Sequence, residues 1–181
     1  MILSRQIMFI ADVVAAATLA ACVSSRDIGK RLQSDPAADS AQAARSIYSD
    51  RTFISHDPHG TQIEYHGPDG RAHLWYPGNF RGVPSIWKIE YDGPGKGHEI
   101  CWQYPASSRN GLTGLSAGGK FQCTPDWLYF PSIVQVLQGD PFNLNSGRVP
   151  FPMPKGKFTA EQLAQQANIP ADRVRTIYKE Y

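Results

Sequence analysis

Apolar and polar side chains alternate through the middle of the chain. In the run 61–65, the apolar Ile63 and Tyr65 alternate with the polar Gln62 and Glu64. A period of two residues is that of a β-strand with one buried face and one solvent face. Two further runs have the same period and an apolar shared face: Trp87, Ile89 and Tyr91 in 86–91, and Ile100, Trp102 and Tyr104 in 99–104.

Turn residues separate these runs. The segment His66–Gly70 combines a proline, which presets φ, with glycines, which permit positive φ. The run 72–76 follows it and gives the second strand of a predicted hairpin. Three more runs complete the pattern: 120–124, 127–130 and 133–137, the last of which fits a strand or a helix. We therefore predict a mainly β fold, an antiparallel meander that forms a curved sheet or a small barrel.

The pattern changes near the C-terminus. Thr159 is a good N-cap, and Gln162 three residues later completes a capping box. The segment Asn168–Pro170 ends this helix and begins another, because proline fits the first turn of a helix. We predict a C-terminal helical hairpin over residues 158–181. Either the sheet closes on itself or this region covers its apolar face.

The N-terminal stretch is typical of an export signal. Arg5 supplies a positive charge, and residues 7–21 supply an apolar run, interrupted by Asp12, that is too short to span a membrane comfortably. The run ends in Leu-Ala-Ala-Cys at 19–22, which resembles the lipobox of bacterial lipoproteins. An ordinary secretory signal and an uncleaved N-terminal helix are the alternatives.

The lipobox resemblance implies cleavage before Cys22 and attachment of lipid, with acyl chains such as palmitate, to that residue. The protein would then be anchored to a membrane of the cell envelope and face the periplasm. Val23, in place of an aspartate, favours the outer membrane. Five segments follow: a signal peptide (1–21), a flexible tether (22–50), a β-domain (51–140), an irregular proline- and glycine-rich linker (141–157) and the helical hairpin (158–181).

Composition adds two points. The formal net charge of the 181 residues is only +2, so we expect no nucleic-acid partner. With Cys22 assigned to lipid, Cys101 and Cys123 form an even pair in an oxidising compartment, where a disulfide is the expected state. Two buried thiols, or a metal pair completed by histidine, are the alternatives.

The segment 75–79 is the candidate recognition surface. Trp75 and Tyr76 are adjacent and therefore point to opposite sides of a strand. We expect one of the two rings to face outward or lie at an edge, close to Asn79, because exposed aromatic side chains mark interaction sites.

The densest polar spot surrounds Pro58. His56, Asp57 and His59 are candidate metal ligands, since histidine and carboxylate side chains both bind zinc. Pro58, however, disfavours a helix that would hold both imidazole rings on one face. We therefore expect no bound metal at these residues and no cofactor elsewhere.

The sequence favours a non-enzymatic protein. Carboxylates for glycoside cleavage are available, but Glu64 and Glu90 fall on predicted solvent faces, and Asp69 and Asp92 fall in turns. We expect a binding or structural module of the envelope, with an envelope protein or a cell-wall glycan as its partner. A small envelope hydrolase, or an inhibitor of one, is the first alternative. A helix-turn-helix DNA-binding protein is the second, should the export interpretation fail.

Several runs together resemble a family of small exported bacterial β-domains. They are Gly60–Tyr65, Pro68–Arg71, Leu74–Asn79, the pair Trp87-Lys88 and Ile100–Tyr104. The resemblance covers about residues 51–124, so it excludes the C-terminal helices. It implies export and a β-rich fold, and it carries over no catalytic residue.

Overall fold

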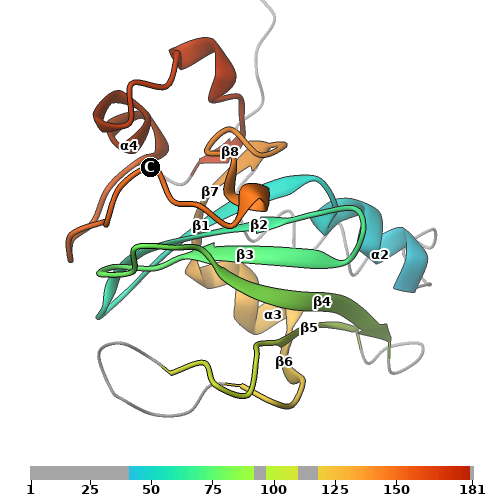
Figure 1. Cartoon of the computed structure of the whole chain (residues 1–181). Coiled ribbons are helices and arrows are strands. Elements are labelled where there is room, and N and C mark those ends of the chain that lie inside the picture. Colours follow the sequence, from blue (N-terminus) through green and yellow to red (C-terminus); the bar gives the residue numbers. More distant parts are fainter. Residues whose placement is uncertain (1–40, 92–96, 110–117, 180–181) are drawn as a thin grey trace, which may run out of the picture.

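The computed structural model describes residues 41–91, 97–109 and 118–179. These residues form one antiparallel sheet of eight strands in the order β6-β5-β4-β3-β2-β1-β7-β8 (Figure 1). The strands are β1 (Arg51–Asp57), β2 (Gly60–His66), β3 (Arg71–Trp75), β4 (Val83–Tyr91), β5 (His98–Gln103), β6 (Gln122–Pro125), β7 (Ile133–Gln138) and β8 (Thr176–Lys179). Strands β1 to β6 are a meander, and β7 returns beside β1. The predicted antiparallel, mainly β fold is confirmed.

The register between strands defines two faces of the sheet. Phe53 lies opposite Glu64 across the β1–β2 pair, and these two side chains belong to what we call the inner face. Ile54 lies opposite Ile63, and these two belong to the outer face. The predicted apolar faces of β4 and β5 are confirmed on the inner face, where four of their side chains are buried: Trp87, Ile89, Ile100 and Trp102.

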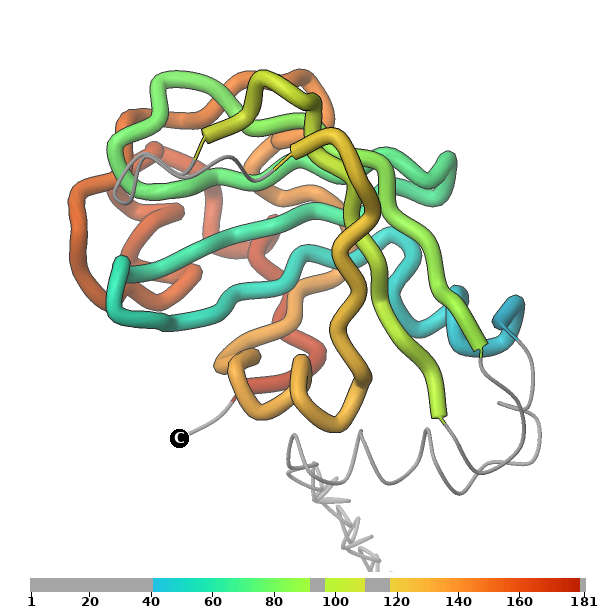
Figure 2. Tube along the Cα trace, turned by 90° about the horizontal axis from the view of Figure 1, so that it is seen from below, coloured from blue at the N-terminus to red at the C-terminus, as the bar shows by residue number. Residues whose placement is uncertain are grey.

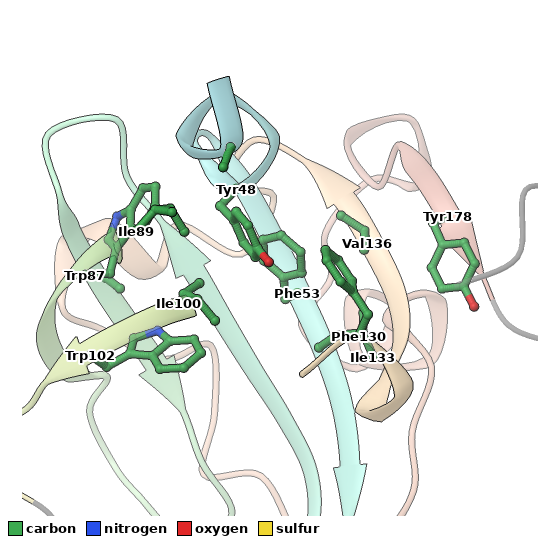
Figure 3. Packing of buried hydrophobic residues seen from close by; sticks show 12 residues of the cluster. Tyr48, Phe53, Trp87, Ile89, Ile100, Trp102, Phe130, Ile133, Val136 and Tyr178 are labelled. Atoms are coloured by element: carbon green, nitrogen blue, oxygen red, sulfur yellow. The ribbon is translucent and has the colours of Figure 1, made fainter. Parts of the chain in front are cut away.

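The sheet curls into a half-barrel around its inner face. The short helices α3 (Asp126–Tyr129) and η2 (Phe130–Ser132) lie inside the curl (Figure 2). The ring of Tyr129 lies 5.2 Å from Trp102 of β5 and 6.0 Å from Phe53 of β1, measured between ring centroids. In a flat sheet these strands would be about 19 Å apart, four spacings of about 4.8 Å. Figure 3 shows the inner side chains converging from both sides of the curl.

The helix α2 (Ala41–Tyr48) closes one end of the half-barrel. Ala44 and Tyr48 are fully buried, and the guanidinium of Arg45 lies 4.6 Å from the centre of the Trp87 ring. Alanine favours helix and leaves room for close packing. Residues 41–48 thus belong to the packed part of the molecule, although composition places them in the tether. Cys22 and the predicted signal peptide lie outside the described residues.

The C-terminal region covers the outer face. Its buried side chains come from the irregular stretch, from η3 (Leu144–Ser146) and from α4 (Ala160–Gln166): Phe142, Leu144, Met153, Ala160, Leu163 and Ala164. At Gly60, with φ at +116°, an added Cβ would lie 2.9 Å from the backbone of Gly156, so only glycine permits this approach. The stretch 141–157 is therefore a packed cover rather than a linker.

The predicted C-terminal hairpin is present only in its first helix. Thr159 caps α4, and both hydrogen bonds of the predicted capping box with Gln162 are formed. Where the second helix was expected, the chain forms the short η4 (Ala171–Arg173) and then β8. The open edge of β7 offers backbone hydrogen bonds to this segment, and β-branched residues such as Ile177 favour a strand.

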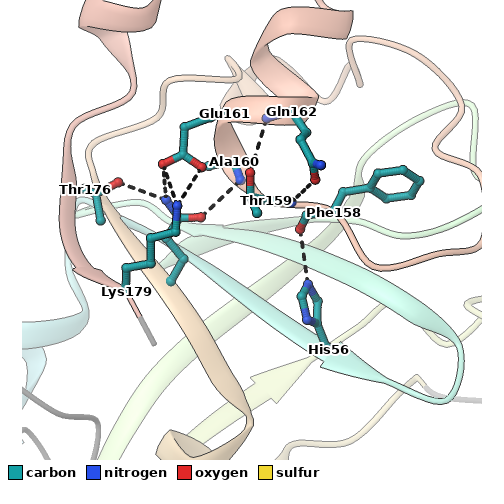
Figure 4. A network of polar contacts seen from close by, with 9 residues as sticks. His56, Phe158, Thr159, Ala160, Glu161, Gln162, Thr176 and Lys179 are labelled. Carbon is teal, nitrogen blue, oxygen red and sulfur yellow. Dashed lines mark hydrogen bonds and ion pairs between the residues drawn. The ribbon is translucent and has the colours of Figure 1, made fainter. Parts of the chain in front are cut away.

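A polar network joins α4 to β7 and β8 (Figure 4). The amide of Gln135, which is buried, donates to Glu161 Oε1 at 3.0 Å and to Thr176 Oγ1 at 2.9 Å. Lys179 Nζ lies 3.2 Å from both carboxylate oxygens of Glu161. These contacts fix the last strand to the cover of the outer face.

The predicted disulfide between Cys101 and Cys123 is present. The two residues are direct partners across the β5–β6 pair, 22 positions apart in sequence. The bond therefore holds the edge strand β6 on the wall of the half-barrel. In the described part of the chain, none of the helices has the length and apolar character needed to cross a membrane.

Candidate functional site

A cavity of about 310 Å³ opens in the inner face at the end of the half-barrel away from α2. Strands β1, β2 and β3 form its floor, and Trp102, Tyr104 and Tyr129 form its aromatic wall. Ligand pockets span about 300 to 1,000 Å³ and commonly lie in the mouths of β-barrels. This cavity is at the small end of that range and suits a ligand of one or two rings.

Glu64 is the central polar residue of the cavity. It lies in the middle of β2, between Phe53 of β1 and Leu74 of β3, and only 8% of it is exposed. Its Oε1 accepts a hydrogen bond from the hydroxyl of Tyr104 at 3.1 Å. A carboxylate in this position costs free energy unless it is well paired. The prediction that Glu64 faces solvent is wrong, because the curl of the sheet encloses its face.

His66 lies behind Glu64 and is fully buried. Its Nε2 lies 3.3 Å from Glu64 Oε2 and 3.2 Å from the indole nitrogen of Trp102. The imidazole stacks on the ring of Trp87, with centroids 5.2 Å apart. Its Nδ1 is buried without a hydrogen-bond partner in the described structure. His66 therefore packs between Glu64 and the aromatic cluster and accepts from the indole of Trp102 at the cavity wall.

The tyrosines of the wall remain protonated. Burial raises the pKa of Tyr104 well above its usual value, and the nearby Glu64 carboxylate raises it further. Burial likewise raises the pKa of Tyr129, with smaller contributions from Glu64 and Asp126. Both phenols consequently act as neutral hydrogen-bond donors and as aromatic surfaces over the whole physiological pH range.

Asp57 and Gln62 form the polar rim of the cavity. Ser55 lies opposite Gln62 across the β1–β2 pair, and the Gln62 amide donates to Asp57 Oδ2. Asp57 Oδ1 also accepts the backbone N–H of His59 at 2.7 Å, which fixes the β1–β2 turn. None of the described residues that line the cavity is a lysine or an arginine. The lining thus offers acceptors and neutral donors but no fixed cation.

The structure does not bring the three candidate metal ligands together. His56 faces the outer side, where its Nε2 lies 3.1 Å from the carbonyl oxygen of Phe158. Asp57 and His59 are closer, with Oδ2 and Nδ1 3.6 Å apart, but His59 Nδ1 also contacts the hydroxyl of Tyr76 at 2.6 Å. Strand alternation separates His56 from Asp57, because adjacent residues point to opposite faces.

Glu90 and Glu99 lie beside the disulfide on the other side of the sheet from the cavity. Their carboxylates and the two sulfur atoms are within 4.8 Å of one another. The sulfur atoms are bonded to each other in this structure, so they offer no thiolate to a metal ion.

The candidate recognition surface at 75–79 is not exposed as expected. Trp75 is fully buried in the outer cluster and donates its indole N–H to the carbonyl of Phe151 at 3.1 Å. Tyr76 is 6% exposed, and Asn79 is half-buried. Adjacent rings do point opposite ways, but the C-terminal cover and the β1–β2 turn bury both of them.

A second buried polar group lies inside the half-barrel, near α2. The hydroxyl of Tyr48 donates to Asp126 Oδ1, and Asp126 Oδ2 lies 3.8 Å from His98 Nδ1. Burial raises the pKa of Asp126, and the Tyr48 hydrogen bond and His98 partly offset that rise. These contacts join α2, α3 and β5, so this group stabilises the fold at the end remote from the cavity.

The segment 114–118 reads Gly-Leu-Ser-Ala-Gly, which has the Gly-x-Ser-x-Gly spacing of a hydrolase nucleophile elbow. Its first four residues lie outside the described structure. An elbow requires a helix directly after the serine, whereas Gln122–Pro125 form the strand β6.

No protein-family model, no curated protein and no solved structure matches this chain at a significant level.

Proposed function

We propose that this protein is a lipid-anchored envelope protein that acts as a non-enzymatic binding module, and that its inner cavity takes a sugar residue of a cell-wall glycan. The observation that carries the proposal is the lining of the cavity. Aromatic rings stand on one side, and a carboxylate and an amide stand on the other, with no lysine or arginine among the described lining residues.

This lining matches the two kinds of surface on a sugar ring. The C–H faces of a sugar are apolar and stack on aromatic rings such as Trp102 and Tyr104. Its hydroxyl groups donate hydrogen bonds, for which Glu64 and Gln62 supply acceptors. A phosphate or carboxylate ligand would meet Glu64 and Asp57 without an arginine or lysine to balance its charge.

The sequence at 19–22 and the position of α2 support the anchored location. The lipobox-like segment precedes a polar stretch that leads to Ala41. Helix α2 then joins the half-barrel at the end away from the cavity. A chain anchored at Cys22 would therefore approach the domain from the side opposite the ligand entrance. We expect Cys22→Ala to abolish labelling of the protein with radioactive palmitate and to release it from membranes.

Blocking the cavity tests the binding function. In Ser55→Phe, a ring would project from β1 into the cavity, and we expect the full-length protein in detergent to stop sedimenting with insoluble peptidoglycan. The matched control is Ser107→Phe, which adds the same ring at an exposed turn away from the cavity. Equal retention of both variants would overturn the proposal, and so would a failure of the parent protein to sediment with glycan.

A further inference from the structure

We propose that the sugar residue held in the cavity is an amino sugar with a free ammonium group, and that Glu64 is the counter-ion of this group. The inference rests on the proposed function and narrows it to one class of glycan, the glycan from which N-acetyl groups have been removed. The inference follows from the groups that lie beside the Glu64 carboxylate.

Glu64 has no fixed cationic partner. Within the described residues, His66 is the one basic side chain within 4.0 Å of its carboxylate. Tyr104 donates one hydrogen bond, but a phenol is neutral and cannot balance a negative charge. Because Glu64 is only 8% exposed, water cannot fully solvate it either.

His66 does not balance the charge, because its Nε2 is already used as an acceptor. An indole N–H is only a donor, so the 3.2 Å contact from Trp102 Nε1 requires a lone pair on His66 Nε2. A nitrogen that accepts from Trp102 carries no proton, and it cannot donate to Glu64 Oε2 at 3.3 Å. His66 Nε2 therefore supplies no hydrogen bond to Glu64, and the Glu64 carboxylate lies at the wall of an open cavity with no lysine or arginine among the described lining residues.

The aromatic wall favours the same ligand chemistry. Trp102, Tyr104 and Tyr129 present π-systems that attract cations, most strongly where water is excluded. An ammonium group between these rings and Glu64 would gain both interactions. An N-acetyl group at the same carbon would remove the positive charge and would place a methyl group against the carboxylate.

Two disaccharides that differ only in acetylation provide the test. They are the β-1,4 disaccharide of glucosamine, with free amines, and its N,N′-diacetyl form. Binding to the full-length protein in detergent is measured by isothermal titration calorimetry at about pH 6, where an alkyl amine is protonated. The variants are Glu64→Gln, which keeps the shape and the acceptor for Tyr104, and Glu90→Gln, the same change at an exposed glutamate on the opposite face.

We expect the free-amine disaccharide to bind the parent and Glu64→Gln to weaken this binding at least about 30-fold, as for loss of one partner of a buried charge pair. We expect Glu90→Gln to bind as the parent does. Equal affinity of the parent for both disaccharides, with no effect of Glu64→Gln, would overturn this inference and leave the glycan-binding function standing. If the parent protein bound neither disaccharide and also failed to sediment with peptidoglycan, both this inference and the proposed glycan-binding function would be overturned.

Discussion

The two faces of the sheet differ in the polar groups that are buried beside their apolar side chains. The outer face is packed against residues 142–164, and the side chains of its cluster are apolar apart from the hydroxyl of Tyr65 and the indole nitrogen of Trp75. The outer face also buries His73 and the amide of Gln135, whereas the inner face buries Glu64, His66, His98 and Asp126 beside aromatic rings of comparable size. Groups of this kind cost free energy when they are buried.

This difference bears on two properties, the stability of the fold and the proposed ligand binding. Apolar packing of the kind that dominates the outer cluster stabilises a fold without the help of ionisable groups. Of the buried carboxylates and histidines of the inner face, Glu64 borders a cavity. Functional sites commonly reduce the stability of the structure that carries them. We therefore expect substitutions in the outer cluster to reduce stability most, and a substitution at Glu64 to affect the proposed ligand binding most.

The largest expected effect is at Trp75 of the outer face. Trp75→Ala would leave a cavity where a fully buried ring now packs, and we expect the free energy of unfolding to fall by about 3 to 5 kcal/mol. Urea unfolding followed by circular dichroism measures this change. The control is Trp127→Ala, because that ring is 63% exposed and should contribute little. Similar losses of stability in both variants would contradict the conclusion that burial of Trp75 in the outer cluster stabilises the fold.

The next largest effect concerns the edge of the half-barrel. Replacing both Cys101 and Cys123 by serine opens a loop of 22 residues, and chain entropy predicts a loss of about 3 kcal/mol. Guanidinium unfolding of the double variant measures the loss. Dithiothreitol should destabilise the parent by a similar amount and leave the double variant unchanged. Unfolding curves that coincide with those of the parent would show that β6 is held by packing alone.

The cap of α4 gives a smaller effect on the outer face. Thr159→Ala removes the hydroxyl that accepts from the backbone N–H of Gln162, and we expect a loss of about 1 kcal/mol. Thr159→Ser keeps the hydroxyl and should restore most of the stability. Differential scanning calorimetry is suited to both variants. A serine variant as unstable as the alanine variant would place the effect in the lost methyl group instead.

The smallest expected effect is a pH dependence of stability that comes from Asp126, a buried carboxyl group inside the half-barrel. Because burial raises the pKa of Asp126 above its ordinary value of 3.8, the folded protein retains a proton that the unfolded chain has released between these two pKa values. Stability from this group is therefore present at acidic pH and is lost as the pH rises through that window. Above the raised pKa of the folded state, the loss is constant.

Asp126→Asn removes this titration while it keeps an acceptor for Tyr48. We expect the stability of the variant relative to the parent to increase from about pH 3.5 to pH 7, in urea titrations at a series of pH values. The pKa of Asp140 is raised as well, but the difference between variant and parent isolates Asp126. Asp172→Asn, at an exposed position, is the control. A difference that is constant with pH would contradict the prediction.

The fold was predictable to the extent that alternation is visible in the sequence. Strands β2 to β6 and the capped start of α4 lie where the pattern places them, within a few residues. Strand β1 was missed because Ser55, His56 and Asp57 read as a polar loop. Strand β8 was missed because Pro170 and the residues of η4 have the pattern of a helix N-terminus. Residues 176–179 form a strand only because they pair with β7.

The site was less predictable, because alternation assigns polar residues to solvent. That assignment assumes one covered face, whereas both faces of this sheet are covered. One signal was available: Phe53-Ile54 and Trp75-Tyr76 are adjacent bulky pairs, which indicates apolar surroundings on both sides of a strand. With both sides covered, Glu64 must be buried, and a buried carboxylate is a candidate functional residue.

The mechanical role of α2 follows from its size and position. It is the first described element after the predicted anchor, and only two of its eight residues, Ala44 and Tyr48, are buried. The next element, β1, is bonded along its length to β2 and β7. Tension applied through the N-terminus would detach α2 before it reached the sheet, so this helix would serve as a weak link that protects the half-barrel. Pulling from residue 22 in optical tweezers should record a short, low-force extension before the main rupture.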